Sequence, residues 1–149
     1  MGRSQPNPPP RWPPHLRVGA LRWVRSSSNY DQTVAFYRDL LGLPIVGSFH
    51  DSYGEDGTIF GLPGVATHLE IVRSHETGRR ADRFDQLVLY LPDSDAVRDA
   101  TEPLRRRGLT PESAIHPYWA ANGAVIFLDP DGRGVVFAPW IYGHEGEPA

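Results

Sequence analysis

The spacing of apolar and polar residues predicts one set of elements in the first half of the chain. Alternation over 16–25 is typical of a strand. Apolar residues at helical spacing over 30–41 then predict an amphipathic helix. Asn29 is a good N-cap for this helix, and Gly42 follows it in the usual C-terminal position. Three further strands are expected, at 44–50, 57–62 and 66–73.

The same order starts again after a polar, charged stretch at 73–83 that is typical of a linker. A strand is expected over 84–91, followed by a helix over 94–107. Pro103 lies inside that helix, where its missing backbone N–H should kink or split it. Three strands are again expected, near 113–117, 123–128 and 134–140.

The two halves are an internal repeat. Gly42, at the end of the first helix, recurs as Gly108, 66 residues later, and the turn residue Gly57 recurs as Gly123. The sequence therefore predicts an α+β fold made of two βαβββ modules. The expected organisation is a proline-rich flexible arm at 1–15, a single domain at 16–143 built from modules 16–73 and 84–140, and a tail at 144–149.

Composition excludes several classes of function. The 149 residues contain no cysteine, which excludes thiol nucleophiles, disulfides and thiolate zinc sites. All 15 basic residues are arginine, so neither Schiff-base chemistry nor a phosphate-loop lysine is available. A net charge of −3 and the lack of a long apolar run favour neither nucleic acid nor a membrane as partner. Without a targeting signal, we expect a cytoplasmic protein.

Candidate chemistry begins with His68 and Glu70, which are two residues apart on an expected strand and therefore project from the same face. They could form half of a metal site, a catalytic acid–base pair, or a polar patch without chemistry. A second candidate is the group His116, Tyr118 and Trp119, because an imidazole beside aromatic rings suits the wall of an organic-ligand pocket. The same three side chains could equally plug a loop.

Four longer stretches show a more specific pattern. They are TVAFYRDLLGL at 33–43, HLEIV at 68–72, DQLVLYLPD at 85–93 and FLDPDGRGVVF at 127–137. Inside a repeat, they resemble the vicinal oxygen chelate superfamily, which includes glyoxalase I, bleomycin-resistance proteins and extradiol dioxygenases. The resemblance implies two βαβββ modules whose curled mixed sheets form a cleft, and a homodimer.

In metal-dependent members of that superfamily, four side chains hold one divalent ion in the cleft. Carried over to this sequence, the first position is Ala20 or Arg22, the second Glu70, the third Gln86 and the fourth Val136. Alanine, arginine and valine do not ligate metals, so the set is incomplete. We therefore expect no cofactor. Glu70 and Gln86 are two potential ligands, so binding of a divalent metal stays an alternative.

Arg22 allows two interpretations, an ion pair with Glu70 or recognition of an anionic ligand. The first functional hypothesis is a binding protein for a small organic ligand. Its pocket would be lined by Arg22, His68, Glu70, Gln86, Tyr90, His116, Tyr118 and Trp119. The alternative is a lyase, isomerase or dioxygenase that uses Glu70 with Gln86 or His68. A third interpretation is an interaction module whose cleft is filled by its own side chains.

Overall fold

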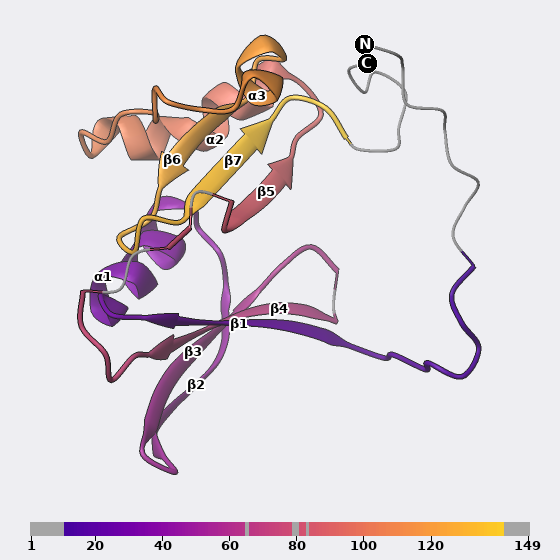
Figure 1. Cartoon of the computed structure of the whole chain (residues 1–149), viewed down its shortest axis with the longest axis vertical. Helices are drawn as coiled ribbons and strands as arrows, with labels where there is room; N and C mark the ends of the chain where they lie inside the picture. The colour runs from indigo at the N-terminus through magenta and orange to yellow at the C-terminus, as the bar shows by residue number, and fades with distance from the viewer. Residues whose placement is uncertain (1–10, 65, 79–80, 83, 142–149) are drawn as a thin grey trace.

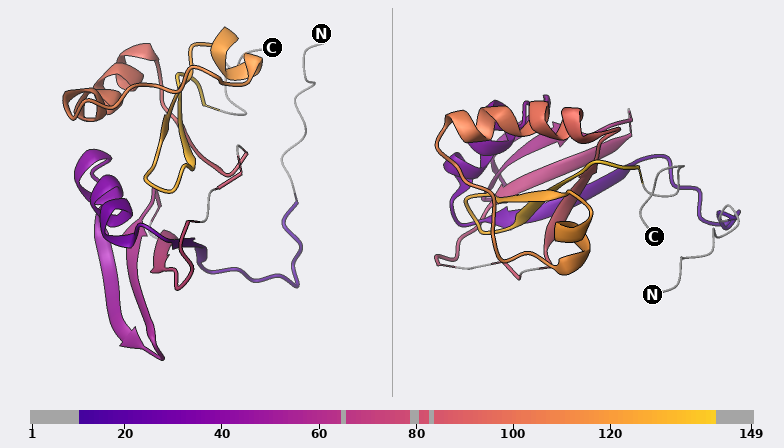
Figure 2. Two further views of the ribbon diagram at one scale, coloured as in Figure 1. Left: turned by 60° about the vertical axis from the view of Figure 1, so that its left-hand side comes forward. Right: turned by 90° about the horizontal axis from the view of Figure 1, so that it is seen from above.

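The computed structural model describes residues 11–64, 66–78, 81–82 and 84–141. It contains two open β-sheets, one from each half of the chain, and the helices α1 and α2 lie on the same side of the molecule (Figures 1 and 2). The α+β class and the duplicated plan predicted from the sequence are confirmed. The predicted arm lies outside the described residues up to residue 10, as does the predicted tail at 144–149.

The first sheet has the strand order β1-β4-β3-β2. β1 pairs with β4 in parallel, and β3 pairs with β4 and β2 in antiparallel fashion. Its elements are β1 (Leu21–Ser27), α1 (Tyr30–Ala35), β2 (Ile45–Ser52), β3 (Glu55–Gly61) and β4 (Thr67–Arg73). β1 begins five residues later than the alternation had suggested.

The second sheet has the order β5-β7-β6, with β5 parallel and β6 antiparallel to β7. Its module consists of β5 (Gln86–Tyr90), α2 (Ser94–Arg106), α3 (Pro117–Ala121), β6 (Val125–Leu128) and β7 (Gly134–Ala138). α2 continues across Pro103 as one helix, so the expected split does not occur.

The strand predicted near 113–117 is wrong. The segment approaches β6 through one backbone bond, from the amide of Glu112 to the carbonyl of Ile126, and then turns into α3. Pro117 is the first residue of α3, where proline is favoured and where its missing N–H is not needed. The ring of His116 caps the helix by accepting a hydrogen bond from the amide of Tyr118 at 3.1 Å.

The helix predicted over 30–41 is present with an altered second half. α1 passes into a π-helix, η1 (Phe36–Leu40), and Gly42 ends it with φ +74°. Asn29 occupies the N-cap position, but its side chain makes no capping bond. Its amide instead donates to the carbonyl of Pro130 and to Asp131, both at 3.2 Å, and so joins the two modules.

One hydrophobic core serves both modules, because the helix-facing sides of the two sheets meet around α1 and α2. Tyr37, Phe60 and Phe127 are fully buried there. Burying an apolar side chain of this size contributes about 1.5–3 kcal/mol, so this shared core is the main reason that the modules stay together. A smaller core covers the opposite face of the second sheet and consists of Ala124, Ile126, Val136, Ala138 and Trp140.

Apolar side chains also remain exposed on the first sheet. Trp23 is 62% exposed and Val24 56%, and both lie on β1, an edge strand. In the described residues, no helix is long and apolar enough to span a membrane.

Candidate functional site

The predicted pair His68 and Glu70 lies on the face of the first sheet that points away from the shared core. Residues paired across the parallel β1–β4 ladder point the same way, so Arg22, which pairs with His68, shares this face. Nη1 of Arg22 lies 3.9 Å from Oε2 of Glu70. The side chain of Glu70 is only 10% exposed, whereas that of Arg22 is 47% exposed. The ion pair that the sequence suggested is therefore present.

Gln86 lines two hollows: with His68, a cavity of about 170 Å³ between the modules, and, away from both His68 and Glu70, a pocket of about 280 Å³ on the second sheet. Glu112 and His116 line the same pocket, and its apolar wall includes Ile126 and Leu128. The capping bond to Tyr118 occupies Nδ1 of His116 and leaves Nε2 for a ligand. Among the described residues, neither the amide of Gln86 nor the carboxylate of Glu112 has a hydrogen-bond or ion-pair partner. Glu112 is a site residue that the sequence analysis missed.

The predicted aromatic residues form a packed group around a fourth ring. The rings of Trp119 and Trp140 are stacked, with centroids 5.9 Å apart. Tyr118 contacts Trp140 at 5.8 Å and Tyr90 contacts it at 6.4 Å. Trp140 is 5% exposed, so these rings cover the second sheet together with its smaller core. Tyr118 and Trp119 therefore pack against the protein's own side chains, as the loop-plug alternative expects. His116 instead lines the pocket on the second sheet.

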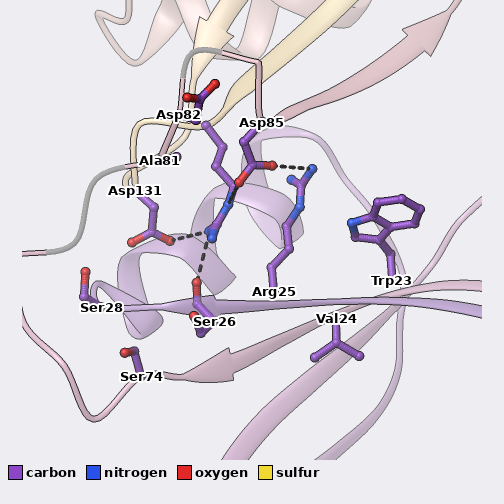
Figure 3. A pocket seen from close by; sticks show the side chains of 11 residues that line it. Trp23, Val24, Arg25, Ser26, Ser28, Ser74, Ala81, Asp82, Asp85 and Asp131 are labelled. Carbon is purple, nitrogen blue, oxygen red and sulfur yellow. Dashed lines mark hydrogen bonds and ion pairs between the residues drawn. The ribbon is translucent and has the colours of Figure 1, made fainter.

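A charged network that the sequence analysis did not find joins the modules behind a polar pocket of about 370 Å³ (Figure 3). Arg25 rises from β1 toward Asp85, and its Nη2 lies 3.2 Å from Oδ1 of that carboxylate. Nε of Arg133 binds the other oxygen of Asp85 at 2.6 Å, and its Nη1 reaches the carbonyl of Ser26 at 3.1 Å. Arg133 also pairs with Asp131 at 3.5 Å.

The turn that carries Asp131 packs against α1 and η1 through buried hydrogen bonds. Thr33 donates to Asp131 at 3.1 Å, and the hydroxyl of Tyr37 donates to Asp129 at 2.7 Å. Burial raises the pKa of Asp129, although the bond from Tyr37 opposes that rise. Burial and the neighbouring Asp129 raise the pKa of Tyr37 well above 10, so its hydroxyl stays a donor at neutral pH.

Comparison with known proteins decides the family. Residues 21–137 match the family described as the Glyoxalase/Bleomycin resistance protein/Dioxygenase superfamily. The chain belongs to this superfamily.

In sequence, this chain is similar to the uncharacterized protein YycE of Bacillus subtilis (strain 168). The two are 34% identical over 125 residues, which cover 82% of this chain and 88% of YycE. The crystal structure of YycE, a protein of unknown function, superposes with a TM-score of 0.79 and 28% identity, covering 92% of this chain and all of that one. The two identities differ because the aligned regions differ.

More distant superfamily members share the fold. FosX from Listeria monocytogenes, a fosfomycin resistance protein crystallised with Mn(II) and 1S,2S-dihydroxypropylphosphonic acid, gives a TM-score of 0.60 at 13% identity. The match covers 85% of this chain and 94% of FosX. Lactoylglutathione lyase from Agrobacterium tumefaciens gives 0.58 at 20% identity, covering 83% and 94%. Identities this low establish the common architecture alone.

At the positions that the resemblance assigned to metal ligands, the side chains present do not fit a divalent ion. The guanidinium of Arg22 is a cation that stands beside Glu70, and Val136 is an apolar side chain with no exposed surface. Glu70 and Gln86 also lie on different sheets, and none of the pockets found in the described part of the chain is lined by both. No group of three or more His, Cys, Asp or Glu side chains that could hold a metal occurs among the described residues.

Proposed function

We propose that this protein binds a small organic ligand without a catalytic metal, in the pocket on the second sheet. The observation that carries the proposal is the convergence of Gln86, Glu112 and His116 on one apolar-walled pocket. Pockets of this composition, with a few polar groups set in an apolar wall, are typical of small-molecule sites.

The free carboxylate of Glu112 selects the kind of ligand. A carboxylate accepts hydrogen bonds and does not donate them when ionised, so it favours a ligand that carries an amine or a hydroxyl group. His116 and Gln86 supply further donors and acceptors, and Ile126 packs against the body of the ligand. Benzylamine is therefore a suitable probe, with benzyl alcohol as its uncharged counterpart.

Titration calorimetry or ligand-observed NMR tests this. We expect Glu112→Gln to weaken benzylamine binding about tenfold, since a hydrogen bond to a charged group contributes about 1.5–3 kcal/mol. The matched control is Glu102→Gln, which removes the same charge from α2, where Glu102 pairs with Arg106 on the surface. Failure of benzylamine and benzyl alcohol to bind, or equal losses in both variants, would contradict the proposal.

Metal analysis tests the second part of the proposal, that the protein works without a catalytic metal. We expect protein purified without chelator to contain far less than one divalent ion per chain. A tightly held stoichiometric ion that Glu70→Gln removes would show that the donor set had been misjudged. The acid–base interpretation of His68 and Glu70 and the cytoplasmic location stay predictions.

The exposed side chains of β1 support a homodimer as part of this proposal. Val24 is 56% exposed on β1, an edge strand, and it lies on the same face as its pairing partner Glu70; exposed apolar residues on edge strands are typical of contacts between chains. A second copy could then bring its second sheet to the face that carries Arg22 and Glu70. We expect a dimer in light scattering and a monomer for Val24→Glu. Val18→Glu, which changes a residue that is 50% exposed outside the strands, should leave the mass unchanged.

A further inference from the structure

Arg25 is a buried charged group with unpaired donors. It is 7% exposed, and although its Nη2 pairs with Asp85, its Nε and Nη1 are buried without a hydrogen-bond partner in the described structure. Buried guanidinium donors that lack acceptors are costly, and proteins rarely leave them so. Asp85 binds Arg25 through one oxygen and Arg133 through the other, at 2.6 Å, and does not reach the remaining donors of Arg25.

Arg25 also lines a second, smaller cavity, which shares only Gln86 with the pocket of the proposed function. The cavity measures about 170 Å³ and lies between the two modules. Its wall is mostly apolar and comes from both halves of the chain, with Leu21, Trp23 and Leu62 on one side and Leu87 on the other. The cavity therefore offers one buried cation inside an apolar wall.

We propose that this inter-module cavity binds a small monocarboxylate with an apolar body, and that the carboxylate binds Arg25. The apolar body would pack on Leu21, Leu62 and Leu87, and the carboxylate oxygens would accept hydrogen bonds from Nε and Nη1 of Arg25. The unpaired donors of Arg25, and not the net charge of the region, favour such a ligand. The carboxylates of Asp85 and Asp131 already match Arg25 and Arg133 in number, yet two donors of Arg25 remain without an acceptor.

The ligand's route to Arg25 passes Trp23. Trp23 and Arg25 lie two residues apart on β1, so their side chains project from the same face, as Figure 3 shows. Both free nitrogens of Arg25 are covered in this structure, and binding therefore requires a neighbouring side chain to turn aside. The indole of Trp23 is 62% exposed, so it can rotate without breaking the core.

Benzoate is the probe, and benzamide is its neutral counterpart of nearly the same shape. Titration calorimetry should show benzoate binding at least about tenfold more tightly than benzamide, because the hydrogen bonds to Arg25 are charge-assisted. Arg25→Met keeps the length of the side chain and removes the charge, and we expect it to abolish the preference for benzoate. Equal binding of benzoate and benzamide to the unaltered protein, or an unchanged preference in Arg25→Met, would overturn the proposal.

If Arg25→Met does not fold, as judged by the absence of a cooperative unfolding transition, a second pair of variants tests the carboxylate site. Leu21 is 52% exposed and lines the cavity, so its substitution leaves the core intact. Leu21→Glu and Leu21→Gln differ almost only in charge. We expect Leu21→Glu to bind benzoate at least about tenfold more weakly than Leu21→Gln, with equal binding of benzamide. Equal benzoate affinity in the two variants would refute a carboxylate site here.

The same titrations separate this site from the pocket on the second sheet. Glu112→Gln should weaken benzylamine and leave benzoate unchanged, whereas Arg25→Met should do the reverse. Loss of benzoate binding in Glu112→Gln would assign benzoate to the other pocket and overturn this inference alone. Benzoate binding that depends on Arg25, without any benzylamine binding, would support the inference while contradicting the proposed function.

Discussion

The hydrogen bond from Tyr37 to Asp129 joins η1 of the first module to the turn before β7 of the second. Its oxygen atoms are 2.7 Å apart, Tyr37 has no exposed surface, and Asp129 is 5% exposed. Tyr37→Phe removes the hydroxyl and keeps the ring that packs on Phe36 and Phe60. The substitution therefore isolates a single buried bond to a carboxylate.

The expected loss follows from the charge of the acceptor. A hydrogen bond to a charged group contributes about 1.5–3 kcal/mol, compared with about 0.5–1.5 kcal/mol for a neutral pair. We expect Tyr37→Phe to lower the free energy of unfolding at neutral pH by about 1.5–3 kcal/mol. For a domain of this size, that corresponds to a fall in Tm of roughly 3–12 °C.

The loss should also depend on pH. Burial raises the pKa of Asp129 in the folded chain, so the stability that its protonation provides is fully present below the unfolded pKa of about 3.9. That stability is lost as pH rises through the folded pKa. The Tyr37 hydroxyl lowers this folded pKa, and its removal raises it further. Tyr37→Phe should therefore lower the free energy of unfolding less at a pH near the unfolded pKa, where the Asp129 carboxyl is neutral, than at neutral pH, where it is ionised.

Urea unfolding followed at neutral pH and at about pH 4 measures both effects. Tyr30→Phe is the matched control, because the Tyr30 hydroxyl lies 2.6 Å from the neutral hydroxyl of Thr58. We expect this control to lose about 0.5–1.5 kcal/mol at either pH. The reasoning is refuted if Tyr37→Phe costs no more than Tyr30→Phe, or if its cost does not change with pH.

Three further substitutions test charge between the modules, backbone strain in a turn and packing within the first sheet, each by urea unfolding. Asp85→Asn removes the carboxylate between two guanidinium groups and should lose roughly 2–3 kcal/mol, less than full burial would give because the side chain is 34% exposed. Gly132→Ala, at φ +82°, should lose about 1–2 kcal/mol, whereas Gly19→Ala, with no such strain and open space around it, should lose none. Gly57→Ala would bring a Cβ to 2.2 Å from the ring of Phe49 and should lose about 1–3 kcal/mol, part of which Phe49→Leu restores.

Local signals in the sequence were sufficient for the family and for the order of elements outside the segment near 113–117. The repeat that relates Gly42 to Gly108 is visible because both glycines end helices with positive φ, a conformation that glycine adopts with little strain. Alternation placed His68 and Glu70 on one face, and the register of β4 agrees with this. Such features depend on neighbours a few residues apart, and the sequence displays them directly.

The position of α3 shows where local signals were outweighed. Alternation near 113–117 suggested a strand, but Pro117 removes a backbone donor and the rings that follow pack on Trp140 instead. The pairing of Tyr118 and Trp119 with a ring about twenty residues later has no signature in the spacing of the segment itself.

The sequence by itself indicated two similar modules and their turns, and the resemblance it carries assigned Ala20 or Arg22 and Val136 to positions where the superfamily keeps metal ligands. Only the tertiary structure decided that Glu70 and Gln86 lie on different sheets, that Glu112 joins Gln86 in a pocket, and that Arg25 meets Asp85 between the modules. The physical reason is separation along the chain. Periodicity sets the direction of each side chain within its own element, whereas the contacts between modules depend on how two sheets and two helices bury a shared core.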